Sequence, residues 1–194
     1  MHSLQHISFA SIRDVTDDNV ITLIKAVGSG LRELNLSGCP LLTDDILISI
    51  RSLCHELCDI DLSYIVQLTK IGLIGLLLNS KDDKGIGALE SVKLRDVKSV
   101  DDDVVIQIAL KGANSLTHVD LSGCNEVTSK AITALKHHCC RSLQSLDISF
   151  IRKIEELILK DFIVHCQQLN ELQMWGCSQV VIENLSFFTG QINC

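Results

Sequence analysis

The segment Leu-Thr-His-Val-Asp-Leu-Ser-Gly-Cys, residues 116–124, decides the fold because related segments recur along the chain. Residues 31–39 read Leu-Arg-Glu-Leu-Asn-Leu-Ser-Gly-Cys, and residues 169–177 read Leu-Asn-Glu-Leu-Gln-Met-Trp-Gly-Cys. With four weaker copies, the segments begin near residues 4, 31, 57, 89, 116, 143 and 169. A period of this length predicts about seven similar units stacked in a row, as a single domain over residues 1–194.

Each unit is predicted to form a short strand followed by a helix. In the second unit, Leu34 and Leu36 alternate with polar residues, as in a strand with one buried face. Thr43 can then cap a helix whose apolar residues recur at helical spacing as far as Leu53. One unit cannot bury its apolar side alone, whereas stacked units can. We therefore expect an α/β solenoid, curved like a horseshoe, with parallel strands on its concave face and helices on its convex face.

The step between the third and fourth units is longer than the others. The additional residues fall in the segment 79–87, which is polar and contains glycine, and we expect a surface loop there. Such a loop is either a tolerated insertion or a binding element. Near the other end of the chain, residues 180–188 are expected to cover the last layer of the core, with Phe187 and Phe188 over it.

The composition favours an aliphatic core and a protein partner. Hydrophobic residues make up 46% of the chain but aromatic residues only 4%, so Leu, Ile and Val are expected to fill the core. The net charge of −7 argues against a groove for nucleic acid, which needs clustered Lys and Arg. A basic protein segment fits this charge better. The sequence contains neither an apolar run of about 18 residues nor a signal-peptide pattern, so we predict no membrane span.

The nine cysteines follow the repeat rather than a disulfide pattern. One set occupies the slot after the strand, and another stands three residues before the first leucine of a unit: Cys39, Cys124 and Cys177, then Cys54, Cys140 and Cys166. We expect these thiols to be buried and protonated, with Cys39 bonded to neighbouring backbone. Without a secretory signal, the nucleus or cytoplasm is the expected location.

Two groups of soft ligands suggest an alternative role as a redox or metal sensor. They are Cys54 with Cys58, and the run 137–140 of two histidines and two cysteines. The two groups lie three units apart, and Cys54 already has a place in the repeat, so the geometry needed for a zinc site is not expected. The sequence contains no nucleophile or phosphate-loop motif. We predict no metal, no cofactor and no catalytic activity.

The residues between the leucines should form columns on the concave face. One column contains Ser8, Asn35, Asp61, Lys93, Asp120, Asp147 and Gln173. Lys93 should stand between Asp61 and Asp120 and bridge them, which leaves Asp120 and Asp147 as like-charged neighbours. This column is either a solvated acidic ridge or a receptor for a basic peptide.

Large side chains lie near the ends of several predicted strands. Tyr64, Arg95, Phe150 and Trp175 are of the types that anchor protein interfaces, and Phe150 and Trp175 stand on adjacent strands where other units have Gly or Ser. The alternative is that they cover the edge of the core. The predicted partner-binding residues of the concave face are Asp61, Tyr64, Lys93, Arg95, Asp120, Asp147, Phe150 and Trp175.

These motifs resemble the cysteine-containing class of leucine-rich repeats. The second unit carries the pattern Leu31, Leu34, Leu36, Cys39 and Thr43-Asp44, and the last carries Cys166, Leu169, Leu172, Met174 and Cys177. Members of this class are often substrate receptors of cullin-type ubiquitin ligases, with an F-box ahead of the repeats. Since Leu4 already begins the first unit, no F-box precedes the repeats here. We expect a fragment, a relative without the box, or a separate region or partner that contacts the ligase adaptor.

A narrower resemblance concerns the C-terminal units. Residues 146–150, Leu-Asp-Ile-Ser-Phe, and residues 171–177, Glu-Leu-Gln-Met-Trp-Gly-Cys, are similar to the closing repeats of the yeast leucine-rich-repeat subunit of the global-genome nucleotide-excision-repair factor. That resemblance implies a subunit of a DNA-damage-recognition complex. The first hypothesis is therefore a non-enzymatic module for substrate recognition in a ubiquitin ligase, and the alternative is a repair subunit.

Overall fold

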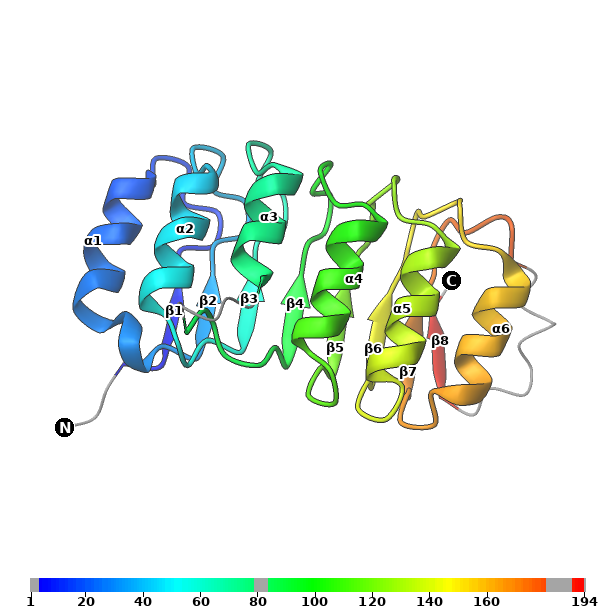
Figure 1. The fold of residues 1–194 in the computed structure, drawn as a ribbon. Helices are drawn as coiled ribbons and strands as arrows, with labels where there is room; N and C mark the ends of the chain where they lie inside the picture. The colour runs from blue at the N-terminus through cyan, green and yellow to red at the C-terminus, as the bar shows by residue number, and fades with distance from the viewer. Residues whose placement is uncertain (1–3, 79–83, 181–189, 194) are drawn as a thin grey trace.

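The computed structural model describes residues 4–78, 84–180 and 190–193, which form an α/β stack of strand–helix units. The strands make one parallel sheet in chain order, and the helices lie side by side along one of its faces (Figure 1). Within the described residues the strands are β1 His6–Ser8, β2 Glu33–Asn35, β3 Asp59–Asp61, β4 Ser91–Lys93, β5 His118–Asp120, β6 Ser145–Asp147, β7 Glu171–Gln173 and β8 Gln191–Asn193. The helices are α1 Asp17–Val27, α2 Asp44–Leu53, α3 Lys70–Leu77, α4 Asp102–Lys111, α5 Ser129–Cys139 and α6 Glu156–His165, with a 3-10 turn η1 at Gly28–Gly30. This architecture confirms the predicted solenoid.

The core fills the space between the sheet and the helices. Leu34, Leu36 and Leu42 of the second unit are almost completely buried, as the alternation predicts. The equivalent residues of the other units join them in one cluster that runs from Val15 to Val180. Because each layer packs against the next, the strands are held in register and their other side chains project from the opposite face.

Hydrogen bonds link the start of each helix to the next unit. The N-cap residue Thr43 donates its backbone N–H and its hydroxyl to the two carboxylate oxygens of Asp17, the first residue of α1, at 3.0 and 2.7 Å. The same pairing recurs in Thr69 with Asp44 and in Thr128 with Asp102. The Thr-Asp pair of the repeat therefore serves two purposes, since Thr caps its own helix and Asp holds the next cap.

One of these links is chemically reversed. Where the three links above have Asp as acceptor, α3 begins with Lys70, and where they have Thr, α4 is capped by Asp101. Lys70 Nζ donates to Asp101 Oδ2 at 2.6 Å and also to Asp103. Donor and acceptor have exchanged sides, and the connection between the units is retained.

The cysteines that follow the strands bond to the preceding unit. The Cys39 thiol donates to the Phe9 carbonyl at 3.1 Å, and the Cys124 thiol donates to the Leu94 carbonyl at 3.1 Å. Burial raises the pKa of the Cys124 thiol to about 12. These cysteines are buried and hydrogen-bonded to backbone, as predicted.

One cysteine departs from the prediction. Cys140 is only half-buried, and the preceding Cys139 is fully buried instead, with its thiol donating to Ala109 O at 3.5 Å. The helix α5 ends at Cys139, and the Cys139 carbonyl accepts the N–H of Leu143. The buried position therefore lies four residues before the leucine in this unit rather than three.

Two peripheral segments add to the predicted pattern. In the described part of the 79–87 segment, Ile86 is buried in the core, and Gly85 O lies 2.9 Å from His55 Nδ1, so the end of this segment is not a freely exposed loop. The eighth strand was not predicted and pairs with β7 through Leu172 and Ile192. The cap expected over 180–188 lies outside the described residues beyond Val180.

Candidate protein-binding surface

The sheet aligns the predicted column on the face away from the helices. Asp61 is opposite Lys93, Lys93 is opposite Asp120, and Asp120 is opposite Asp147 on neighbouring strands. Asp61 and Asp120 are partly exposed and Lys93 is exposed, but Asp147 is only 5% exposed. Asp147 therefore belongs to the buried floor of this face.

Arg95, not Lys93, forms ion pairs with Asp120 and Asp147. Its Nη2 donates to Asp120 Oδ2 at 2.9 Å and to Asp147 Oδ2 at 2.7 Å, and its Nε donates to Asp120 at 3.1 Å. Lys93 forms no ion pair within the described part of the chain. The prediction that Lys93 bridges Asp61 and Asp120, and that Asp120 and Asp147 lack a bridge, was wrong.

Local backbone bonding explains why Arg95 takes this place. Asp120 and Asp147 each use Oδ1 to accept the N–H two residues ahead, from Ser122 and Ser149. Their carboxylates therefore lean toward the ends of the strands, where Arg95 lies. The guanidinium offers several donors in a planar fork and can hold two carboxylates at once.

The same turn recurs where the sequence has Asp or Asn followed by one residue and Ser. Asn35 Oδ1 accepts the N–H of Ser37, and Asp61 Oδ1 accepts the N–H of Ser63. Sequence reasoning treated this column as surface charge and missed its structural role. The Asx-turn preference of Asp and Asn is the signal that could have identified it.

A left-handed backbone position follows each strand from β1 to β7. It is occupied by Ser11, Gly38, Tyr64, Asp96, Gly123, Phe150 and Gly176, all with φ between 56° and 75°. Glycine adopts this conformation freely, whereas a bulky side chain there is strained by about 1 kcal/mol or more. Tyr64 and Phe150 nevertheless occupy it, and they are 49% and 55% exposed. Burial in the core does not compensate for this strain.

Phe150 and Trp175 form an aromatic platform at the C-terminal end of this face. Phe150 N donates to Trp175 O at 2.6 Å, and Trp175 N donates to the hydroxyl of Ser149 at 3.1 Å. The Phe150 ring lies over Gly176, because a Cβ added there would be 2.7 Å from a ring carbon. Trp175 is 48% exposed. Hydrogen bonds thus fix the backbone of both residues, and the Phe150 ring also lies against Gly176. Both side chains are about half exposed, so they are not buried in the core.

A hollow lies at the opposite end of the concave face, with a volume of about 350 Å³. Its charged lining includes Glu33, Asp59, Asp61 and Lys93. Sequence reasoning did not select Asp59. Burial raises the pKa of this carboxyl, while a hydrogen bond with Ser91 and the charge of Lys93 act against that rise. The first residues of the strands form a second column on this face, and applying the alternation to that column would have identified Asp59.

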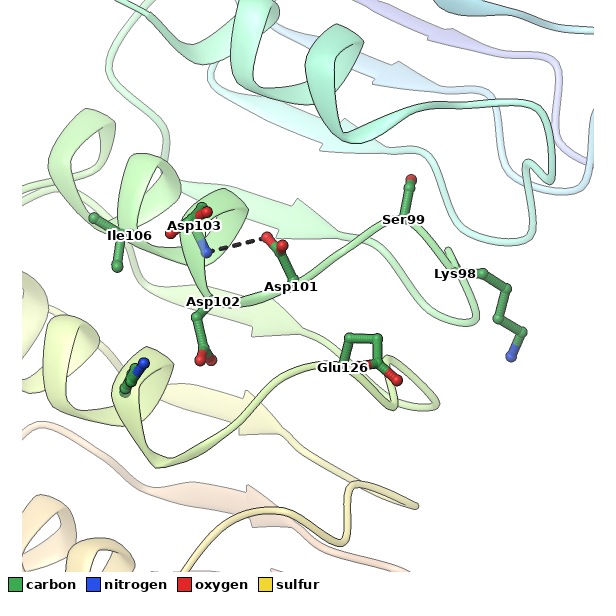
Figure 2. Close-up of a pocket in the computed structure, with 8 residues that line it drawn as sticks. Lys98, Ser99, Asp101, Asp102, Asp103, Ile106 and Glu126 are labelled. Atoms are coloured by element: carbon green, nitrogen blue, oxygen red, sulfur yellow. Dashed lines mark hydrogen bonds between the residues drawn. The ribbon is translucent and has the colours of Figure 1, made fainter.

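Another hollow, of about 430 Å³, lies at the N-terminal end of α4 (Figure 2). Figure 2 shows Asp101 turned toward the backbone of Asp103, and Asp101 Oδ1 accepts the N–H groups of Asp103 and Val104. Asp102 holds Thr128 of the next unit. These carboxylates lie at the N-terminal end of α4, where negative side chains are favourable.

A metal site and a membrane span each have requirements that the described residues do not meet. In the ranges 4–78, 84–180 and 190–193, no three His, Cys, Asp or Glu side chains are grouped so that they could hold a metal ion. Within the same ranges, none of the helices has the length and apolar character needed to cross a membrane.

Comparisons with known proteins agree with the repeat. Leucine-rich-repeat family models match residues 30–53 and 112–136. The chain is 30% identical over 169 residues to DNA repair protein rhp7 of Schizosaccharomyces pombe and 29% identical over 150 residues to DNA repair protein RAD7 of Saccharomyces cerevisiae. These alignments cover 87% and 76% of the chain but only 30% and 26% of the relatives. The chain therefore spans less than a third of either relative.

A solved structure has the same fold. The crystal structure of the Rad7 and Elc1 complex in yeast superimposes with a TM-score of 0.81 at 24% identity, covering 92% of this chain and 44% of the matched chain. The fold and the exposed face of the sheet together define this chain as a leucine-rich-repeat protein. Within that class, the chain is homologous over its repeats to rhp7 and RAD7.

Proposed function

We propose that this chain is a non-enzymatic protein-recognition module that binds its partner on the concave face, through the aromatic platform of Phe150 and Trp175. The observation that supports this role is the exposure of Phe150 in a strained left-handed position. Folding alone favours glycine there, as in the equivalent Gly123. An aromatic side chain in that position provides a rigid, partly apolar contact surface of the kind found at interface hot spots.

The partner belongs to a DNA repair assembly in the nucleus. This proposal follows from the similarity to two DNA repair proteins over most of the chain. The second candidate function is substrate recognition in a ubiquitin ligase, which the cysteine-containing repeat class suggested. In the solved structure with the same fold, Rad7 is in complex with a second protein, Elc1, which supports a role within a protein assembly. Contact with a ligase adaptor would then use a region outside the concave face.

Affinity purification of the chain with bound proteins tests the proposal. The double variant Phe150→Ala/Trp175→Ala should lose the recovered repair or ligase component by at least about tenfold, while its melting temperature stays close to that of the unmodified chain. The matched control is Leu157→Ala/Val164→Ala, which removes exposed apolar side chains from α6 on the convex face. Retention of the partner by the aromatic variant, or unfolding of that variant, would contradict a surface role.

A further inference from the structure

The charges of the concave face are divided unequally between its two ends. Around β5 and β6, Arg95 forms ion pairs with both Asp120 and Asp147, which leaves one net negative charge on these three groups. Around β3, the described residues provide no Lys, Arg or His nitrogen within 4.0 Å of the carboxylates of Asp59 or Asp61. The carboxylates that still lack an ion-pair partner therefore lie in the hollow at β2–β3, whereas Asp120 and Asp147 already share Arg95.

The hollow carries more negative than positive charge. Glu33 pairs with His6 at 2.7 Å, but both side chains are more than half exposed, so solvent weakens this pair. Lys93 lines the hollow without an ion pair among the described residues. Three carboxylates thus stand against one lysine and one histidine. A cationic side chain placed in the hollow would gain attraction from Asp59 and Asp61, whereas an anionic one would be repelled.

The aromatic platform lies several strands away from this hollow. Phe150 follows β6 and Trp175 follows β7, three and four strands away from β3 in the sheet. Neighbouring strands are about 4.8 Å apart, so the separation measured across the strands is roughly 14–19 Å. An extended peptide advances about 3.3 Å per residue, which corresponds to roughly four to six residues.

We propose, on the basis of the protein-recognition role above, that the concave face binds an extended segment that crosses the strands. One Lys or Arg of that segment enters the hollow beside Asp59 and Asp61, and an apolar side chain about four to six residues away packs on Phe150 and Trp175. Between these ends the segment passes over the Arg95–Asp120–Asp147 cluster, whose carboxylates already pair with Arg95. The partner is thus a basic, extended polypeptide and not an acidic one.

Selection from a library of random peptides of about twelve residues, long enough when extended to span β3 to β7, tests this inference on the full chain. Selected peptides should contain a basic and an apolar residue at the proposed spacing. Trp175 is the single tryptophan, so its emission should change when a selected peptide binds. Replacing the basic residue of that peptide by Glu should weaken binding at least about tenfold, a test that requires no change in the protein.

The complementary test changes the protein. Asp59→Asn/Asp61→Asn keeps the shape of both side chains and should weaken binding of the selected peptide about tenfold or more. Asp18→Asn/Asp45→Asn removes the same charge from exposed positions on α1 and α2 and should leave the peptide affinity nearly unchanged.

The outcomes separate the two proposals. The basic-segment inference alone would be overturned if the selected peptides depend on Phe150 and Trp175 but bind equally well after the Glu replacement and to Asp59→Asn/Asp61→Asn. Selection of acidic peptides would overturn it as well. Failure to obtain any peptide that depends on Phe150 and Trp175 would overturn the proposed surface together with this inference.

Discussion

Single residues set the charge that the concave face presents. Asp120 and Asp147 would repel each other without a cation, and Arg95 supplies it with three hydrogen bonds. Burial raises the pKa of the Asp120 carboxyl and nearby Asp147 adds to the rise, whereas the Ser122 N–H and Arg95 lower it. Arg95 thus opposes the rise in the pKa of the Asp120 carboxyl and supplies the positive charge that Asp120 and Asp147 share.

Replacing Arg95 by Ala should lower the free energy of unfolding by about 2–3 kcal/mol at neutral pH, because two neighbouring carboxylates then lose their cation. The loss should become smaller as the pH falls. A carboxyl whose pKa is higher in the folded than in the unfolded state makes folding less favourable as the pH rises through the folded-state pKa. Protonation at low pH removes this cost. Urea unfolding at several pH values measures both effects.

The control for that experiment is Lys93→Ala. Lys93 is exposed and makes no ion pair with the described residues, so its replacement should change the free energy of unfolding by no more than about 0.5 kcal/mol. If the loss in Arg95→Ala were the same at every pH, repulsion between Asp120 and Asp147 would not be its cause.

At the scale of elements, the helices are joined through their N-terminal ends as well as through the core. Asp17 holds the cap of α2 in the way that Asp102 holds the cap of α5. The link between α3 and α4 is reversed, with Lys70 as the donor and Asp101 as the acceptor. The two residues at each link therefore have to be considered as a pair, because each is favourable only with its matching partner.

The reversed link predicts a coupled pair of substitutions. Lys70→Asp alone should lower the urea midpoint, because the new carboxylate meets Asp101 and Asp103. Adding Asp101→Thr recreates the Asp–Thr pair found at the α1–α2, α2–α3 and α4–α5 links and should recover most of that loss. Urea unfolding of the two single variants and the double variant gives the coupling energy. Strict additivity of the two changes would contradict this account of the links.

At the scale of the whole molecule, one continuous core from Val15 to Val180 connects the units. A unit in the middle of the stack is packed on both sides, so a cavity there weakens two interfaces between units. Since each core layer packs mainly on its two neighbours, the stability of the stack depends on each interior layer.

Leu121→Ala should therefore lower the free energy of unfolding by about 2–5 kcal/mol, because Leu121 is completely buried and the cavity would remain unfilled. Thermal or urea unfolding measures this change. Leu157→Ala on α6 provides the comparison, since Leu157 is 73% exposed and its loss should cost no more than about 0.5 kcal/mol. An unchanged midpoint for Leu121→Ala would contradict its place in the core.

The sequence by itself determined the stack of strand–helix units, the face on which Leu34 and Leu36 are buried, and the cap at Thr43. These properties follow from periods of two and 3.6 residues and from the cap preference of Thr, which are local and repeat in every unit. It also placed Asp61, Lys93 and Asp120 in one column, because side chains alternate along a strand.

Only the tertiary structure decided which charged groups meet and which aromatic side chains stay exposed. Arg95 reaches across two strands to Asp147, and the Phe150 ring lies over Gly176 of the next unit. The hollow beside Asp59 likewise depends on how several strands curve together. The physical reason is that a long side chain can contact several neighbouring strands. Which group it contacts depends on the direction of the side chain and on the hydrogen bonds that the other group already makes, and neither follows from spacing along the chain.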